Sequence, residues 1–103
     1  MTGAEFDTLA RGLAGSTARP HFDRMAYRVR RNFATLAADG QSANLCLSPE
    51  EQAHWCALLP RAFAPVPNKW AARGWTTVAL AAIDAGGLRP ALDAAWRSAG
   101  GQD

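Results

Sequence analysis

The sequence has few of the features that mark membrane, secreted or disulfide-rich proteins. None of its apolar runs approaches the roughly 18–20 residues that a membrane span needs. The N-terminus has no basic segment ahead of its apolar residues, so we expect no signal peptide and a cytoplasmic protein. The chain contains only two cysteines, Cys46 and Cys56, whose spacing matches no redox or zinc pair of the CxxC kind. We expect both to be free, buried thiols.

Signatures of catalysis, cofactor binding and metal binding are missing as well. The sequence has no Gly-rich phosphate loop and no recognisable pairing of a nucleophile with a base. Most of its nine acidic residues stand at predicted helix starts or in one turn, where capping and the helix dipole explain them. His54 and Cys56 are two residues apart on a predicted helix, so they point apart and cannot share a metal ion. We therefore expect no enzyme, cofactor or metal site.

Positive charge is modest over the whole chain but concentrated in one place. The net charge is +2, and Lys69 is the only lysine. Between Arg19 and Arg31 there are five arginines and a single acid, Asp23, whereas the rest of the chain has six basic and eight acidic residues. A local positive field of this kind steers an anionic partner toward one part of a protein.

Hydrophobic periodicity predicts a helix near each end of the chain. Thr2 and Glu5 have the spacing of a capping box, an apolar stripe follows them, and Gly15 is expected to end the helix. Residues 16–20 are expected to form a connector. Asp84 can cap the last helix, in which a proline falls within the first turns. The predicted buried side of this helix consists of Leu88, Leu92, Ala95, Trp96 and Ala99.

A middle helix is predicted to begin after Ser48. Ser48 can cap this helix, Pro49 suits its first position, and Glu51 has the spacing that completes a capping box. The helix is expected to run to about Leu59, because a proline follows there. Trp55 is predicted to lie outside the apolar stripe, where it would either meet a partner or pack under a neighbouring loop.

From residue 21 to residue 48 the period changes to two, which predicts an antiparallel meander of strands. Its turns are predicted at Arg31-Asn32 and at Asp39-Gly40, because these residue types tolerate left-handed backbone angles. In the first strand one predicted face carries Met25, Tyr27 and Val29, and the other carries Ala26, Arg28 and Arg30.

Two extended segments follow the middle helix. Residues 62–68 contain two prolines and can only form an edge, whereas residues 74–83 are predicted to form a strand. The chain is therefore predicted to be a single α+β domain, residues 1–103, with a mainly antiparallel sheet and N-terminal, middle and C-terminal helices.

The motif "RVR" at residues 28–30 leads into "FATL" at 33–36, and Trp70 precedes "GWT" at 74–76. In this order and spacing, these stretches resemble the MmcQ/YjbR family of small bacterial proteins over about residues 19–99. The resemblance implies a CyaY-like fold and a "double wing" arrangement in which two hairpins flank a helix. It also implies DNA binding, and it brings no catalytic residues.

The sequence departs from the family pattern at two places. Arg31-Asn32 stand where the family usually has Gly-Lys in the first strand turn, and Ala71 stands where a Gly often follows the first Trp. The first departure bears on the geometry of the turn and removes a lysine, although Arg31 keeps a charge nearby.

The arginines of the first predicted strand are candidate ligands for phosphate. Arg28 and Arg30 are two residues apart, about 6.5–7 Å along one face of a strand, which suits successive phosphates of a nucleic acid. Guanidinium groups bind phosphate oxygens in pairs, and Arg24 and Arg31 extend the row. The same pattern fits a solvated outer face of an antiparallel sheet, in which the stems of the arginines cover apolar neighbours.

A second basic group surrounds Trp70, which Lys69 and Arg73 flank within a polar loop. Cations beside an aromatic ring can grip single-stranded bases, or they can form a cation–π pair that holds the loop in place. Trp75 begins the next strand and is expected in the core. If the loop and the first hairpin lie on the same side of the sheet, their charges form one surface.

We therefore predict a non-enzymatic protein that binds DNA weakly, through the phosphate backbone and without sequence preference. The alternatives are a protein- or small-molecule-binding module with a basic face, and a domain whose arginines only keep it in solution. A pocket lined by Trp70, Tyr27 and His21 would favour the small-molecule alternative, and a monomer or a homodimer is expected. The predicted nucleic-acid-binding residues are Arg24, Arg28, Arg30, Arg31, Lys69 and Arg73.

Overall fold

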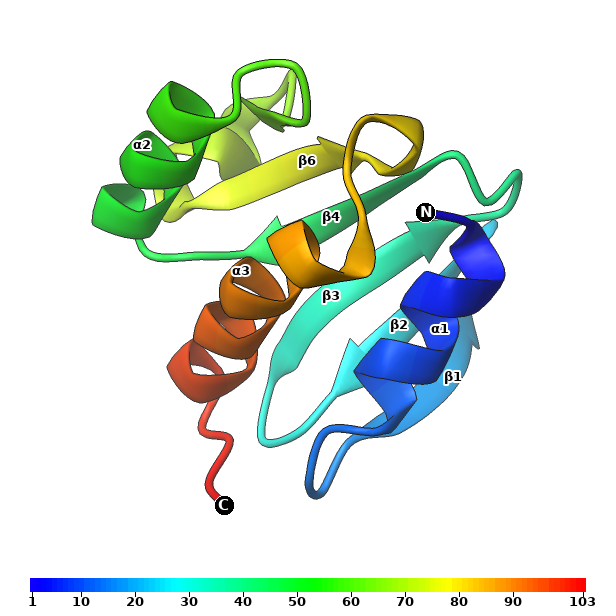
Figure 1. The fold of residues 1–103 in the computed structure, drawn as a ribbon. Helices are drawn as coiled ribbons and strands as arrows, with labels where there is room; N and C mark the ends of the chain where they lie inside the picture. The colour runs from blue at the N-terminus through cyan, green and yellow to red at the C-terminus, as the bar shows by residue number, and fades with distance from the viewer.

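Six antiparallel strands form a single sheet in the computed structural model, which describes residues 1–103 (Figure 1). The strands are β1 (Thr17–His21), β2 (Arg24–Arg28), β3 (Asn32–Ala37), β4 (Ser42–Cys46), β5 (Phe63–Pro65) and β6 (Trp75–Ala79). Their order across the sheet is β1-β2-β3-β4-β6-β5, so that β1 and β5 are the edges. Strands β2, β3 and β4 follow one another as the predicted meander, β1 adds a strand before them, and β6 pairs with β4 after the middle helix.

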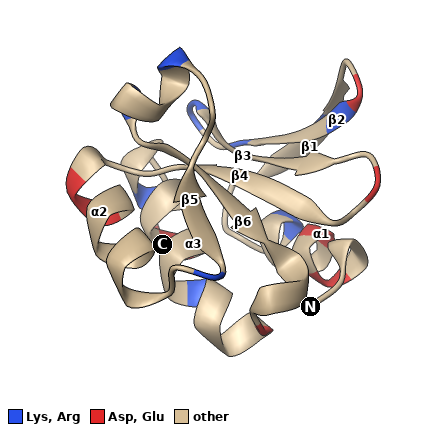
Figure 2. Ribbon diagram, turned by 90° about the horizontal axis from the view of Figure 1, so that it is seen from above, with Lys and Arg blue, Asp and Glu red and all other residues tan.

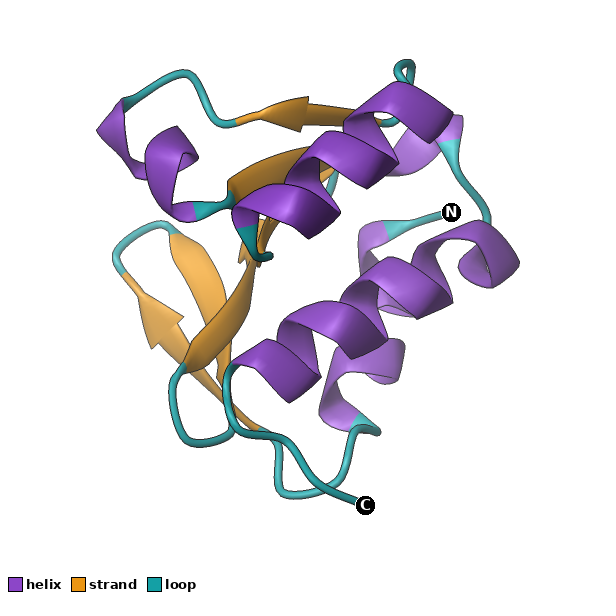
Figure 3. Ribbon diagram, turned by 90° about the vertical axis from the view of Figure 1, so that its left-hand side faces the viewer, coloured by secondary structure: helices purple, strands orange, loops and turns teal.

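Three α-helices lie on one side of this sheet, which we call the covered face (Figure 3). The helices are α1 (Gly3–Arg11), α2 (Pro49–Leu58) and α3 (Ala85–Ser98), and there are two short 3-10 helices, η1 (Lys69–Arg73) and η2 (Leu80–Ala82). The short helix η1 lies toward the opposite side, which we call the open face (Figure 3). The predicted α+β class with helices near both ends and in the middle is confirmed. No helix is both long enough and apolar enough to cross a membrane.

Alternation along the strands decides which side chains meet the helices. Tyr27, Leu45 and Val78 point to the covered face and are fully buried, and they form one cluster with Phe6 of α1 and Trp96 of α3. The rings of Phe6 and Tyr27 meet edge to face, with 5.7 Å between their centroids. Because each large apolar side chain that is buried contributes about 1.5–3 kcal/mol, the covered face supplies most of the stability.

A β-bulge in β3 adjusts this alternation near the second turn. Tyr27 pairs with Ala34, but the next residue, Arg28, pairs with Asn32, so Phe33 is the extra residue. Phe33 and Ala34 are consecutive and yet both are fully buried in the core cluster. A bulge allows this because it places two residues of one strand opposite one residue of its partner. It also leaves Asn32 on the open face, where it lines the groove described below.

The predicted helices near the two ends of the chain begin where expected, but the first of them ends early. The capping box of Thr2 and Glu5 is present, and the Asp84 carboxylate accepts a hydrogen bond from the backbone N–H of Gly87 at the start of α3. The five side chains predicted for the buried side of α3 are all buried. The expectation that Gly15 ends α1 is wrong, because the helix stops at Arg11 with Gly12 as its C-cap.

The predicted connector at residues 16–20 is instead most of strand β1. It pairs with β2 from Thr17 opposite Arg28 to His21 opposite Arg24. Pro20 cannot donate a ladder hydrogen bond, but β1 is an edge strand, and an edge strand tolerates a proline. The pairing creates a β1–β2 hairpin with Phe22 and Asp23 at its tip.

The middle helix begins as predicted but its capping box is only half formed. Ser48 Oγ accepts a hydrogen bond from the backbone N–H of Glu51. The Glu51 carboxylate instead accepts a hydrogen bond from Trp55 Nε1 at 2.8 Å. Trp55 is half-buried and its ring lies 5.8 Å from that of Phe63, so it packs against a neighbouring segment as one alternative proposed.

The predicted extended segments after α2 are both shorter than expected. Residues 63–65 form the edge strand β5, as the prolines of this segment indicated. The predicted strand over residues 74–83 ends at Ala79, and Leu80–Ala82 turn into η2 before Asp84 caps α3.

Candidate functional site

The open face carries the alternate residues of the same strands, and they are mostly polar. Ala26, Thr35, Asn44 and Thr77 lie side by side across β2, β3, β4 and β6 by their register. None of the three α-helices covers this row (Figure 3). An antiparallel sheet with one solvated face shows this pattern of apolar and polar alternation.

Two arms rise on this side of the sheet (Figure 2). Residues of both arms line a groove. One arm is the β1–β2 hairpin, and the other is the segment from Val66 to Gly74, which contains η1 and which we call the η1 arm. The space between them, which we call the open-face groove, has a volume of about 470 Å³. Its lining residues are His21, Arg24, Asn32, Thr35, Asn44, Val66, Asn68, Trp70 and Trp75.

Arg24 is the only arginine or lysine in the lining of the groove. Its Nε donates a hydrogen bond to Thr35 Oγ1 at 2.8 Å, which holds the side chain across the neighbouring strand. Its Nη2 atom is buried and has no hydrogen-bond partner within the protein. Because an unpaired buried donor is costly, and most of all on a charged group, an acceptor on a ligand that reached this nitrogen would form a favourable hydrogen bond.

The η1 arm is held in place by polar contacts from both of its ends. Asn68 caps η1 by accepting a hydrogen bond from the backbone N–H of Trp70 at 2.9 Å. Gln52 of α2 donates from its side-chain amide to the carbonyl oxygens of Ala71 and Trp75, at 3.1 and 3.0 Å. The arm is therefore positioned by the middle helix although it lies at the open face.

Gly74 closes the η1 arm in a conformation that other residues cannot adopt. Its φ is +94°, and a Cβ at this position would lie 1.8 Å from the carbonyl oxygen of Leu47. The close approach allows the Leu47 N–H to donate to the Gly74 carbonyl oxygen at 3.1 Å. Glycine is needed here for both its backbone angle and its lack of a side chain.

Trp70 is 47% exposed, and two basic residues lie near it in the sequence, Lys69 before it and Arg73 after it. Lys69 Nζ lies 5.8 Å from the centre of the Trp70 ring, and the Arg73 guanidinium carbon lies 5.3 Å from it. These are cation–π distances, so the cation–π pair, one of the two alternatives for this loop, is present. Trp75, which was expected in the core, is only half-buried and lines the open-face groove instead.

The arginines of the predicted phosphate row do not continue along one strand. Strand β2 ends at Arg28, and residues 29–31 form the turn, so the regular spacing from Arg28 to Arg30 is lost. Arg31 donates a hydrogen bond from Nη2 to the carbonyl oxygen of Ser98 in the last turn of α3. This contact places a cation at the negative end of a helix. The Arg30 side chain packs against Gly100, just beyond that helix.

The six predicted binding residues thus separate into two groups. Arg24 lines the groove, the register places Arg28 on the open face opposite Thr17, and the other two cations of this group lie on the η1 arm. Arg30 and Arg31 lie instead at the C-terminal end of α3. The hairpin and the loop do lie on one side of the sheet, since both line one groove.

The pocket residues named for a small-molecule site are only partly brought together. His21 and Trp70 line the same groove, but Tyr27 lies on the covered face. Its hydroxyl donates to Asp7 Oδ1 at 2.6 Å, and burial, followed by that carboxylate, raises the pKa of Tyr27. Tyr27 is therefore a core residue with a satisfied hydroxyl.

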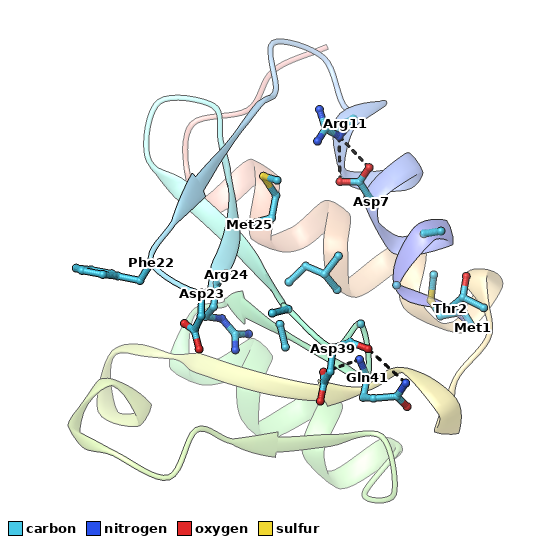
Figure 4. Close-up of a pocket in the computed structure, with 16 residues that line it drawn as sticks. Met1, Thr2, Asp7, Arg11, Phe22, Asp23, Arg24, Met25, Asp39 and Gln41 are labelled. Carbon is cyan, nitrogen blue, oxygen red and sulfur yellow. Dashed lines mark hydrogen bonds and ion pairs between the residues drawn. The ribbon is translucent and has the colours of Figure 1, made fainter.

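Phe22 stands at the tip of the hairpin and is unusual in two ways. Its side chain is 94% exposed and projects away from the protein (Figure 4). Its φ of +56° makes it the only residue other than glycine with a positive φ. Its ring meets the His21 ring edge to face at 4.8 Å between centroids, so it lies next to the wall of the open-face groove.

A larger hollow of about 970 Å³ lies beside α1 and the hairpin (Figure 4). Its lining includes Phe22 and three acids, Asp7, Asp23 and Asp39, against two arginines, Arg11 and Arg24, so Arg24 borders both this hollow and the open-face groove. Arg11 is already bonded from Nε to both Asp7 oxygens at 2.9 Å. The charge in this hollow is therefore mixed and partly neutralised, which makes it a poorer site for an anion than the open-face groove.

The cysteines and histidines do not assemble into a site. Cys46 and Cys56 are free and half-buried, and burial raises the pKa of both thiols, so they are not activated nucleophiles. No group of three or more His, Cys, Asp and Glu side chains comes together in a way that could hold a metal ion.

Sequence reasoning did not identify the polar residues on the sheet that line the groove, or the two residues that hold the η1 arm in place. Thr35 and Asn44 occupy the outward positions of strands whose inward positions had been recognised as core. The same two-residue alternation that identifies the core side chains therefore also indicates which polar side chains lie on the opposite face. Asn68 and Gln52 could not be found in this way, because their roles depend on contacts between separate elements.

Comparison with known proteins identifies a family and a fold. The YjbR family model matches residues 11–98 of the chain. The crystal structure of the Deinococcus radiodurans protein DR2400, which has a DUF419 domain, is similar with a TM-score of 0.77. The two share 20% sequence identity, and the likeness covers 92% of this chain and 75% of that one. Among curated proteins, none matches the chain.

Proposed function

The chain belongs to the YjbR family, and from the geometry of its open face we propose that it is a binding module for nucleic acid and not an enzyme. The observation that carries this proposal is the meeting of Arg24 and Trp70 in one groove on the uncovered side of the sheet. A guanidinium nitrogen without a hydrogen-bond partner can bind a phosphate, and an exposed aromatic ring can stack on a base.

The distribution of charge supports the same partner. Basic residues mark both arms of the open face, together with one acid, Asp23, at the hairpin tip, whereas acidic residues mark the starts of α1 and α2 (Figure 2). A phosphate chain that approaches this molecule is therefore attracted to the open face and repelled from the helix starts. We assign the phosphate contacts to Arg24, Arg28, Lys69 and Arg73.

Arg30 and Arg31 are left out of this assignment because they are engaged elsewhere. Arg31 already donates to the end of α3, and the stem of Arg30 packs on Gly100. This division gives a matched control, since two neighbouring arginines can be removed from each group with the same change in net charge.

Fluorescence anisotropy with labelled DNA strands tests the proposal. About four phosphate contacts predict that affinity falls roughly 50- to 150-fold between 50 and 200 mM salt. The double variant Arg24→Ala/Arg28→Ala is expected to weaken binding at least tenfold and to flatten the salt dependence. The control Arg30→Ala/Arg31→Ala is expected to bind within about twofold of the unchanged protein. If no strand binds at 50 mM salt, the proposal is wrong.

A second candidate function is the binding of a small anion with an aromatic ring. His21 and Trp70 line one groove whose volume of about 470 Å³ is in the range of small-molecule sites. Calorimetry with a mononucleotide and with a longer strand separates the two candidates. Equal affinity for both would favour the small-molecule function, whereas binding that grows with strand length favours nucleic acid.

A further inference from the structure

The open-face groove combines groups that recognise three different parts of a nucleotide. Its walls carry the rings of His21, Trp70 and Trp75, which can stack on a base. Its floor carries the side-chain amides of Asn32 and Asn44, which can both donate and accept hydrogen bonds. Arg24 adds a positively charged donor that has no partner. A phosphate alone would need only the last of these groups.

The aromatic surface in the groove is available to a ligand although cations already touch it. Lys69 and Arg73 pack on Trp70, yet 47% of this residue remains exposed. Trp75 is half-buried in the same lining, where it begins β6 and pairs with Cys46 of β4. Stacking on such rings requires a free face of a base.

A base pair inside a duplex cannot supply that free face. Its two faces are covered by the neighbouring pairs, and only its edges reach the grooves of the duplex. All three α-helices lie on the covered face, so no α-helix is free to enter a major groove from the open face (Figure 3). Unpaired bases, in contrast, can be turned outward and stacked on aromatic side chains.

We infer that the open-face groove holds one unpaired base, so that the ligand of this protein is single-stranded nucleic acid. The inference rests on the proposed function and narrows it. Arg24 binds the phosphate of the nucleotide, the tryptophans contact the face of its base, and the amides of Asn32 and Asn44 reach its edge.

Phe22 extends this site to a second nucleotide. It adjoins His21 at the rim of the groove and is almost fully exposed. A positive φ is unfavourable for a bulky residue, and the contact described for the Phe22 ring within the fold is its edge-to-face contact with His21. A base that leaves the groove along the hairpin would stack on this ring.

Three probes of equal length and equal label test the inference by fluorescence anisotropy at 50 mM salt. They are a single strand of thymidines, a duplex, and a strand of abasic sites that keeps the phosphates but has no bases. The thymidine strand is expected to bind about tenfold tighter than either of the others, because stacking is lost in both. The three probes separate the contribution of bases from that of phosphates.

Variants of uncharged groove residues complete the test. Trp70→Ala and Asn44→Ala are expected to weaken binding of the thymidine strand five- to tenfold and to leave the abasic strand unchanged. Thr77→Ala is the control, because Thr77 lies beside Asn44 in the register but does not line the groove. Circular dichroism checks that each variant is folded.

The outcomes distinguish the inference from the proposed function. If the duplex or the abasic strand binds as tightly as the thymidine strand, the inference is wrong and the proposed function stands. If the groove variants weaken all three probes equally, the base does not occupy the groove, and the inference is also wrong. If none of the probes binds, the proposed function is wrong, and the inference that rests on it is wrong as well.

Discussion

The two faces of this sheet are made from alternate residues of the same strands and yet differ in almost every physical respect. The covered face is apolar and closely packed, with Tyr27, Phe33 and Leu45 fully buried. The open face carries polar side chains, one guanidinium nitrogen without a partner and an exposed tryptophan. The difference teaches that the stabilising core and the proposed binding face of this fold are separated by a single step along the chain.

The largest expected difference between the two faces comes from a pair of aromatic substitutions, one on the covered face and one on the open face. Phe33→Ala is expected to lower the free energy of unfolding by about 3–5 kcal/mol, because it leaves a cavity in the core. Trp70→Ala is expected to lower it by less than about 1 kcal/mol, because that ring is half exposed. Urea unfolding measures both. Similar losses for the two variants would show that the faces are not separate.

Gly74→Ala tests how the η1 arm is fixed to the sheet. The added methyl group would clash with the Leu47 carbonyl, and the backbone would keep an unfavourable positive φ. We expect a loss of about 2–3 kcal/mol in the free energy of unfolding, and a loss of binding that exceeds what the unfolded fraction explains. Ala72→Gly, in the same arm, is the control for added flexibility. Unchanged binding by folded Gly74→Ala protein would remove the arm from the site.

Two substitutions at Phe22 separate the cost of its backbone from the use of its ring. Phe22→Gly and Phe22→Ala both remove the ring, but only glycine relieves the positive φ. We expect the glycine variant to be more stable than the alanine variant by about 1 kcal/mol in thermal unfolding. Both are expected to bind a single strand equally weakly. A glycine variant that is no more stable than the alanine variant would show that the turn is unstrained.

The smallest expected effect concerns acid and lies on the covered side. Burial alone would raise the pKa of Asp7, but hydrogen bonds from Tyr27 and Arg11 outweigh it and lower the pKa below 3.8. Because the folded pKa is lowered, the ionised carboxylate stabilises the fold above the unfolded value, and this stabilisation is lost as pH falls through the folded value. Asp7→Asn is therefore expected to lose less stability than the unchanged protein between pH 5 and pH 2. Equal losses in urea unfolding would contradict this.

The sequence was sufficient for the parts of the fold that local rules determine. The caps at Thr2, Ser48 and Asp84 and the core side of α3 follow from residue type and spacing within one element. Strand β1 was missed because Pro20 weighs against a strand in isolation, whereas pairing with β2 decides the matter. The bulge at Phe33 likewise depends on a partner strand.

The candidate site was harder to predict because it is assembled from distant segments. The cluster of arginines is evident from the sequence, but its separation into two groups in the structure is not. Arg31 is drawn to the end of α3, which lies 67 residues away in the sequence. The groove joins a hairpin near residue 21 to a loop near residue 70, and no periodicity relates them.

The backbone of Phe22 has a consequence for how this protein varies among its relatives. A mutation from phenylalanine to glycine, asparagine or aspartate at the hairpin tip is favoured by the positive φ, and the packing contact that it removes is the one with the His21 ring. Random drift would therefore remove the ring wherever it has no use. Relatives that retain the groove residues are expected to keep an aromatic side chain at this position, and relatives that have lost Arg24 and Trp70 are expected to have a small or polar one. Position 22 would then serve as a marker of which members of the family still bind.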